Sequence, residues 1–94
     1  VHTHDELERA LEISPEIIGV NSRNLKTLDV DARAFSELIP QIPSTIARVA
    51  ESGISTREEV AFAQQCGATA ILVGEALVRS ESPSVAINQL LGRL

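Results

Sequence analysis

The sequence predicts an α/β fold with three parallel strands and flanking helices, formed as a single segment over residues 1–94. Three aliphatic, β-branched runs predict the strands: 17–20, 46–50 and 70–73. Helical patterns lie between the runs, and the spacing suits one strand and one helix per unit. Because the runs are nearly continuous in apolar character, we expect strands covered on both faces.

The first two helices are predicted from their starts. Thr3 and Glu6 have the spacing of a capping box. The apolar face that follows is Leu7, Ala10 and Leu11. Asp31 is a candidate cap for a second helix that ends before Pro43. That helix is expected to bury Phe35, Leu38 and Ile39.

The last helices also carry boundary signals. Ser55 and Glu58 form a second capping-box pattern, and Gly67 closes the helix. Val60, Ala63 and Gln64 follow within that helix. A short turn is expected after Gly74-Glu75. The final helix begins at Ser82-Pro83, where proline suits the first position, with Val85, Leu90 and Leu91 as core contacts.

Composition excludes several classes of function. A net charge of −5 without a basic run argues against binding to nucleic acid or to an anionic membrane. No apolar run approaches the length of a membrane span. The single cysteine, Cys66, cannot form an intrachain disulfide, which favours a cytoplasmic protein. Because Cys66 precedes a helix-ending glycine and has no matched histidine partner, we expect it to be a buried packing residue. His2 and His4 lack partners at metal-ligand spacing, and no metal site is expected.

The loops after the three strands are the expected binding site, because parallel strands end on one side of a sheet. Ser52-Gly53 and Gly74-Glu75 lie at equivalent places in consecutive units. Their backbone N–H groups can bind an oxyanion, as in barrel phosphate sites. The alternative is that both glycines only relieve backbone constraints in ordinary loops.

Three side chains beside these loops are candidates for chemistry. Glu51 directly follows an apolar strand, where a carboxylate can orient a lysine; the alternative is a solvated loop acid. Asn21 and Arg23 can bind a substrate carboxylate or hydroxyls. Their alternative roles are loop capping and a surface ion pair.

Three segments together closely resemble indole-3-glycerol-phosphate synthase: 17–25, 51–54 and 72–77. The resemblance implies the C-terminal part of a (βα)8 TIM barrel, from the helix after strand five through strand eight and its helix. It implies a carboxy-lyase of tryptophan biosynthesis that closes the indole ring of 1-(2-carboxyphenylamino)-1-deoxyribulose 5-phosphate, with loss of carbon dioxide and water. It implies no cofactor and no metal.

The resemblance also implies roles for individual residues. Asn21 and Glu51 match catalytic positions, and Arg23 is a candidate for holding the anionic substrate. The phosphate-binding positions are Ser52, Gly53, Gly74 and Glu75, the last three acting mainly through backbone N–H groups. The Glu75 side chain is then expected to turn away from the phosphate.

The resemblance also implies that catalytic lysines come from earlier strands, and Lys26 matches neither of them. We therefore expect the 94-residue chain to be inactive by itself and to pair with a missing N-terminal barrel segment or with itself. The alternatives are a non-catalytic partial barrel that binds a phosphorylated sugar, a different phosphate-binding barrel enzyme, or an interaction module, because a sheet cut from a barrel exposes its edges.

Overall fold

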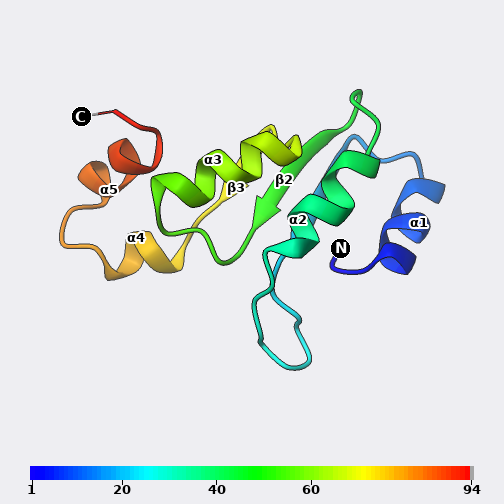
Figure 1. Cartoon of the computed structure of the whole chain (residues 1–94), viewed down its shortest axis with the longest axis horizontal. Helices are drawn as coiled ribbons and strands as arrows, with labels where there is room; N and C mark the ends of the chain where they lie inside the picture. Colours follow the sequence, from blue (N-terminus) through cyan, green and yellow to red (C-terminus); the bar gives the residue numbers. More distant parts are fainter. Residues whose placement is uncertain (94) are drawn as a thin grey trace.

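The computed structural model describes residues 1–93, in which helices and strands alternate as predicted (Figure 1). The elements in chain order are α1 (His4–Glu12), β1 (Ile17–Asn21), α2 (Arg33–Leu38), the 3-10 helix η1 (Ile39–Gln41), β2 (Ala47–Glu51), α3 (Arg57–Cys66), β3 (Ala70–Leu72), α4 (Glu75–Arg79) and α5 (Pro83–Leu90).

The three strands form one parallel sheet in the order β1-β2-β3. Asn21 of β1 is level with Glu51 of β2, and Glu51 is level with Leu72 of β3. The register therefore brings the carboxyl ends of all three strands into one row. This confirms the predicted three parallel strands with flanking helices.

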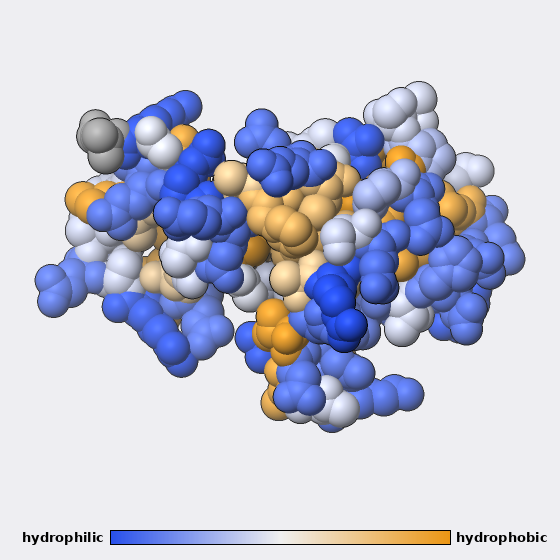
Figure 2. Space-filling view, in the orientation of Figure 1, coloured by the Kyte–Doolittle hydropathy of each residue, from blue (hydrophilic) through white to orange (hydrophobic). Residues whose placement is uncertain are grey.

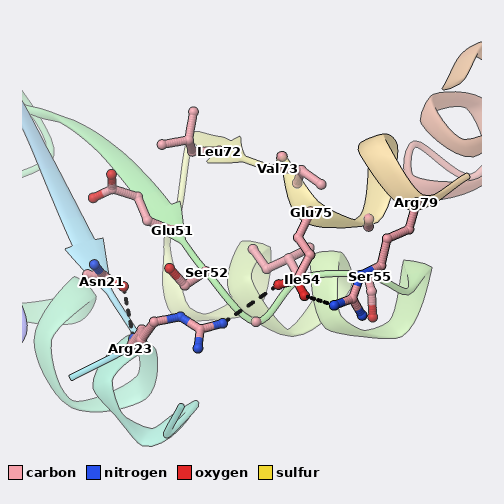
Figure 3. Close-up of a pocket in the computed structure, with 13 residues that line it drawn as sticks. Asn21, Arg23, Glu51, Ser52, Ile54, Ser55, Leu72, Val73, Glu75 and Arg79 are labelled. Atoms are coloured by element: carbon pink, nitrogen blue, oxygen red, sulfur yellow. Dashed lines mark hydrogen bonds and ion pairs between the residues drawn. The ribbon is translucent and has the colours of Figure 1, made fainter. Parts of the chain in front are cut away.

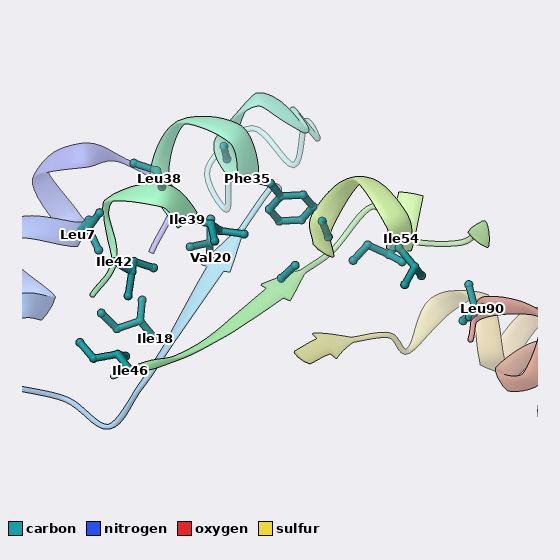
Figure 4. Close-up of a cluster of buried hydrophobic side chains, with 14 residues drawn as sticks. Leu7, Ile18, Val20, Phe35, Leu38, Ile39, Ile42, Ile46, Ile54 and Leu90 are labelled. Atoms are coloured by element: carbon teal, nitrogen blue, oxygen red, sulfur yellow. The ribbon is translucent and has the colours of Figure 1, made fainter. Parts of the chain in front are cut away.

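The hydrophobic core lies on one side of the sheet, under α2, η1 and α3 (Figure 4). Strand residues Ile18, Val20 and Ala50 point into it and are almost fully buried. The helical layer and its loops contribute Leu7, Ala34, Phe35, Leu38, Ile39, Ile42, Ile46, Ile54, Val60, Ala63 and Leu90. Figure 2 shows apolar surface between α2 and α3, where Phe35 and Phe62 line a hollow of about 310 Å³.

The expectation that every strand is covered on both faces is wrong. In β1, Ile18 and Val20 are buried, whereas Ile17 is 63% exposed. In β3, Ala70 and Leu72 are exposed. Alternate residues of a strand point to opposite faces, and in the part of the chain that the structure describes the helices pack against one face. Ile46 and Val73 lie just outside the strands that were predicted to include them.

The first capping box is present, and the second lies one residue later than predicted. Thr3 and Glu6 cap α1 reciprocally. The N-cap of α3 is Thr56 with Glu59, rather than Ser55 with Glu58. Ser55 instead donates its backbone N–H to Glu59 Oε1 at 3.0 Å, so the Glu59 carboxylate gathers donors from both residues. Gly67 ends α3 with a φ of +112°, as expected.

Other helix details depart from the sequence prediction. The N-cap of α2 is Ala32, one residue later than predicted. The Asp31 carboxylate accepts the Arg33 backbone N–H at 3.0 Å and pairs with the Arg33 guanidinium at 2.7 Å. Gln64 is exposed. In α5, Leu90 is buried while Val85 is exposed, and Leu91 is exposed after the helix. Because α5 packs on α3 and α4 along one side, its other apolar residues remain outside the core.

Val1 continues the sheet beyond β1, on the edge opposite β2. Its amino group donates to the Gly19 carbonyl at 2.6 Å, and the Asn21 amide donates to the Val1 carbonyl at 2.7 Å. This alternation is the hydrogen-bond pattern of parallel strands. His2 Nδ1 lies 2.6 Å from the Asn21 carbonyl, which can only accept, so Nδ1 carries the hydrogen.

Within residues 1–93, the structure contains no helix that is both long enough and apolar enough to span a membrane.

Candidate active site at the strand ends

A cavity of about 750 Å³ lies at the carboxyl ends of the three strands (Figure 3). It brings together all seven residues that the sequence selected: Asn21, Arg23, Glu51, Ser52, Gly53, Gly74 and Glu75. Their roles stay predictions, but their convergence follows directly from the parallel register.

Glu51 lies over the sheet face that the helices leave uncovered, above Gly19 of the neighbouring strand. A Cβ at Gly19 would overlap the Glu51 carboxylate, so only glycine leaves room for this orientation. The Glu51 side chain is half-buried and has no ion-pair or hydrogen-bond partner among residues 1–93. A carboxylate placed in this way is available to a ligand or to a cation from outside the described residues.

Asn21 ends β1 beside Glu51 and points to the same side of the sheet (Figure 3). Its Oδ1 accepts from the backbone N–H of Arg23 at 2.9 Å, which fixes the rotamer. Because Oδ1 is occupied, the Nδ2 group remains as the donor that Asn21 can offer to a ligand.

The Ser52-Gly53 turn is held in a left-handed conformation, with φ values of +71° and +68°. Ser22, which is fully buried, donates its hydroxyl to the Ser52 carbonyl at 3.0 Å. A Cβ at Gly53 would lie 2.7 Å from Val30 Cγ1, so the turn needs glycine there for space as well as for φ. The turn is therefore positioned by β1 and by the loop that follows it.

The Gly74-Glu75 loop differs from the Ser52-Gly53 turn. Gly74 has a φ of −124° and open space around its Cα, so its backbone imposes no requirement for glycine. In residues 1–93, the backbone N–H groups of Gly53 and Glu75 donate to no carbonyl or side chain. These donors are available to a bound oxyanion.

Arg23 is held by a closed loop. Arg23 and Val30 form an isolated antiparallel bridge, and the Asp31 amide donates back to the Ser22 carbonyl at 2.8 Å. The guanidinium donates through Nη1 to the Leu28 carbonyl at 2.9 Å. Its other amino group, Nη2, faces the cavity and Glu75.

The Glu75 side chain lies on the cavity wall, and its turning away from a bound phosphate stays a prediction. Its carboxylate lies between two arginines, with Oε1 2.7 Å from Arg79 Nη2 and Oε2 3.8 Å from Arg23 Nη2 (Figure 3). The two positive charges explain the orientation. Sequence reasoning missed Arg79, although its place one helical turn after Glu75 is a pairing signal.

A second cavity, of about 620 Å³, adjoins the first. Asn21, Arg23 and Glu51 line both cavities, so these side chains stand at their boundary. The additional charged groups of the second cavity include Arg9 and Lys26, and His2 lines it as well. Lys26 belongs to the loop after β1. His2 and Arg9 reach the strand ends because Val1 pairs with β1, which sequence patterns do not reveal.

The structure gives no metal site in the part of the chain that it describes, because no three His, Cys, Asp or Glu side chains cluster there. His4 instead lies 3.0 Å from Glu8, one turn along α1. Cys66 packs against the core, and burial raises the pKa of its thiol.

The family model described as indole-3-glycerol phosphate synthase matches residues 1–90. The indole-3-glycerol phosphate synthase of Kineococcus radiotolerans is 48% identical over 97% of this chain and 33% of its own length. Indole-3-glycerol phosphate synthase 1 of Streptomyces coelicolor is 47% identical over 97% of this chain and 34% of its own length. The chain thus spans about a third of the length of these relatives, matching their C-terminal third.

A solved structure is similar in fold. The crystal structure of the Amycolatopsis orientalis BexX/CysO complex contains a chain that matches with a TM-score of 0.67 and 31% identity, over 96% of this chain and 40% of that chain.

Proposed function

This chain belongs to the indole-3-glycerol phosphate synthase family, and from that premise we propose that it forms the phosphate-binding side of a synthase active site. The enzyme would act as a carboxy-lyase in tryptophan biosynthesis. Its substrate would be 1-(2-carboxyphenylamino)-1-deoxyribulose 5-phosphate, whose ring closure releases carbon dioxide and water.

The observation that carries this proposal is that the seven predicted site residues converge on one cavity at the ends of three strands. Within residues 1–93, the N–H groups of Gly53 and Glu75 in this cavity donate to no other group, which suits a phosphate. The Glu51 carboxylate, which has no partner among the described residues, and the Asn21 amide lie in the same row. An anion-binding end beside a carboxylate and an amide fits a substrate with a phosphate at one end and a reacting carbon skeleton at the other.

We assign Glu51 to orienting and charging a lysine from the rest of the barrel, because a carboxylate stabilises an ammonium group beside it. Asn21 would donate through Nδ2 to a substrate oxygen. Arg23 would bind the anionic substrate, and Ser52, Gly53, Gly74 and Glu75 would surround the phosphate. The chemistry as proposed uses no metal and no cofactor.

The 94-residue chain would be inactive without a segment that brings the catalytic lysines. General acid–base catalysis contributes about 10²–10⁴-fold and needs its group within hydrogen-bond reach. We therefore propose that a preceding barrel segment is the partner of this chain, and that the enzyme works in the cytoplasm.

The test is complementation. The chain is combined with a segment equivalent to the preceding two thirds of the Kineococcus radiotolerans relative, and indole-3-glycerol phosphate formation is measured. The mixture should turn over substrate while each part does not, and Glu51→Gln should lower kcat by about 10²-fold or more. Glu37→Gln, an equal charge change on the outer face of α2, serves as the control.

Two results would contradict the proposal. One is turnover by the purified chain at the rate of the mixture, because catalysis would then need no further segment. The other is full activity of the Glu51→Gln mixture, because Glu51 would then be a solvated loop acid.

A further inference from the structure

We propose that the Glu75 side chain acts as an internal anion that competes with phosphate for Arg23 and thereby selects for doubly charged ligands. The inference rests on the proposed phosphate site and goes further, because it gives a specificity role to the Glu75 side chain, for which the sequence predicted only that it turns away from the phosphate. Arg79 becomes the residue that holds Glu75 in place.

The geometry places Glu75 between two positive charges on the cavity wall. Its Oε1 is 2.7 Å from Arg79 Nη2, which is a charge-assisted hydrogen bond. Its Oε2 is 3.8 Å from Arg23 Nη2, which is an ion pair too long for a hydrogen bond. The contact with Arg23 is therefore the weaker of the two and the first to open.

Arg23 is the fixed member of the pair. Its Nη1 is engaged by the Leu28 carbonyl, and the loop that carries it is closed by the bridge to Val30. The Arg23 side chain is 32% exposed, against 60% for Glu75. An incoming anion would consequently find the guanidinium already oriented, and the carboxylate would be the group that moves.

The charges decide which ligand can displace Glu75. Phosphate carries between one and two negative charges near neutral pH and offers several acceptor oxygens. A carboxylate such as acetate carries one charge and two oxygens, which only equals what Glu75 already provides. Phosphate should therefore displace Glu75 from Arg23, whereas a monovalent carboxylate should not.

The cavity wall contains two arginines and two glutamates, namely Arg23, Arg79, Glu51 and Glu75. With Glu75 in place the four charges cancel, and a monovalent anion gains little from entering. When phosphate displaces the Glu75 carboxylate from Arg23, Glu75 keeps its hydrogen bond to Arg79. The Arg23 charge then has no neighbouring carboxylate, and the local field favours the anion that replaced it. Selectivity would thus come from a competition inside the chain.

The experiment titrates the 94-residue chain with inorganic phosphate and, separately, with sodium acetate, using calorimetry at constant ionic strength and pH 7.5. Glu75→Gln should bind phosphate about two- to fivefold tighter, the range expected for removing one exposed ion pair, and should gain measurable acetate binding. Glu81→Gln is the control, because it makes the same charge change outside the cavity.

A second substitution isolates the competition at Arg23. In a chain that already carries Arg23→Gln, adding Glu75→Gln should no longer tighten phosphate binding. All these side chains are at least partly exposed, and thermal unfolding of each variant verifies that the fold is retained.

The outcomes separate this inference from the proposed function. If the starting chain binds phosphate and Glu75→Gln leaves its affinity unchanged, the competition is refuted while the phosphate site stands. An equal gain in Glu81→Gln also refutes it, because the effect is then one of net charge. If neither the starting chain nor the Glu75→Gln chain binds phosphate, the proposed phosphate site is wrong, and the inference fails with it.

Discussion

Ser52 and Gly53 both have a left-handed backbone conformation, but substitutions at the two positions should change stability in opposite directions. Ser52 forms no side-chain hydrogen bond within residues 1–93, so replacing it by glycine should relieve strain at no cost in contacts. We expect Ser52→Gly to raise the free energy of unfolding by up to about 1 kcal/mol. Gly53→Val should lower it by about 1–3 kcal/mol, because its Cβ would collide with Val30.

Urea denaturation measures both changes. Gly53→Val should also weaken phosphate binding, since the turn can no longer approach a ligand closely. A stable Gly53→Val chain that binds phosphate normally would show that the turn plays no part in the site.

Gly19 is the second residue whose lack of a side chain has a functional consequence. Gly19→Ala places a methyl group where the Glu51 carboxylate lies, so the carboxylate must turn away. We expect Gly19→Ala to cause at least half of the loss in rate that Glu51→Gln causes in the complemented enzyme. Adding Gly19→Ala to a Glu51→Gln enzyme should cause little further loss; additive losses would mean that Gly19 acts independently of Glu51.

At this scale the sequence predicted the residues that follow each strand and missed those that act across strands. Asn21, Glu51 and Ser52 are found by the rule that strand ends meet. Gly19 matters only because the register sets it beside Glu51, and His2 only because Val1 pairs with β1. Both depend on three-dimensional pairing that no local spacing encodes.

Among the elements, α1 and α3 depend on capping carboxylates that make their stability sensitive to acid. Hydrogen bonds led by the His2 amide hold the pKa of Glu6 below 4.5. For Glu59, burial raises the pKa, but hydrogen bonds from Ser55 and Thr56 outweigh it and lower the pKa below 4.5. A carboxylate whose pKa is lowered by folding contributes its full stabilisation at pH values above its pKa in the unfolded chain.

The chain should therefore keep constant stability above about pH 5, as far as these groups contribute, and lose it as the pH falls below 4.5 through the folded pKa values. Glu59→Gln should make the loss of stability at low pH smaller. Glu58→Gln, which changes the same helix turn without touching the cap, should not. Thermal unfolding between pH 3 and pH 7 checks the prediction, and identical pH profiles for the three chains would contradict it.

The order and type of the elements could be predicted because apolar runs and caps alternate along the chain. The boundaries of the elements were harder to predict from the sequence. Ser55 and Thr56 are both hydroxyl residues with a glutamate three positions later, so the pattern fits either start, and the backbone chooses Thr56. For Asp31, the carboxylate accepts both the Arg33 guanidinium at 2.7 Å and the backbone N–H of Arg33 at 3.0 Å. These hydrogen bonds lower the pKa of Asp31 to about 2.

The whole molecule is thin, with extents of 41 × 30 × 19 Å. Its radius of gyration of 13.5 Å exceeds the value of about 12 Å expected for a compact chain of this length. On the sheet face away from the helices, Ile17, Ala47, Ala70 and Leu72 remain exposed. Apolar surface of this kind favours association.

We expect the purified chain to form dimers or larger species at tens of micromolar, a concentration at which exposed strand edges associate. Ile17→Lys, which charges the uncovered face, should shift the population toward monomer. Val78→Lys, an exposed change on helix α4 rather than on the sheet, should leave the population unchanged. Sedimentation velocity distinguishes the species, and a compact wild-type monomer would contradict the expectation.

The parallel register also has a consequence for how the chain folds. Ile17 pairs with Ala47, thirty residues on, whereas Val49 pairs with Ala70 after twenty-one. The longer loop costs only ~0.3 kcal/mol more to close, while each large apolar side chain that it buries returns ~1.5–3 kcal/mol. The β1-α2-β2 unit holds Ile18, Val20, Phe35, Leu38, Ile39, Ile42 and Ile46. The β1-α2-β2 unit should accordingly form the folding nucleus. Amide hydrogens of β1 and β2 should then exchange with solvent more slowly than those of β3.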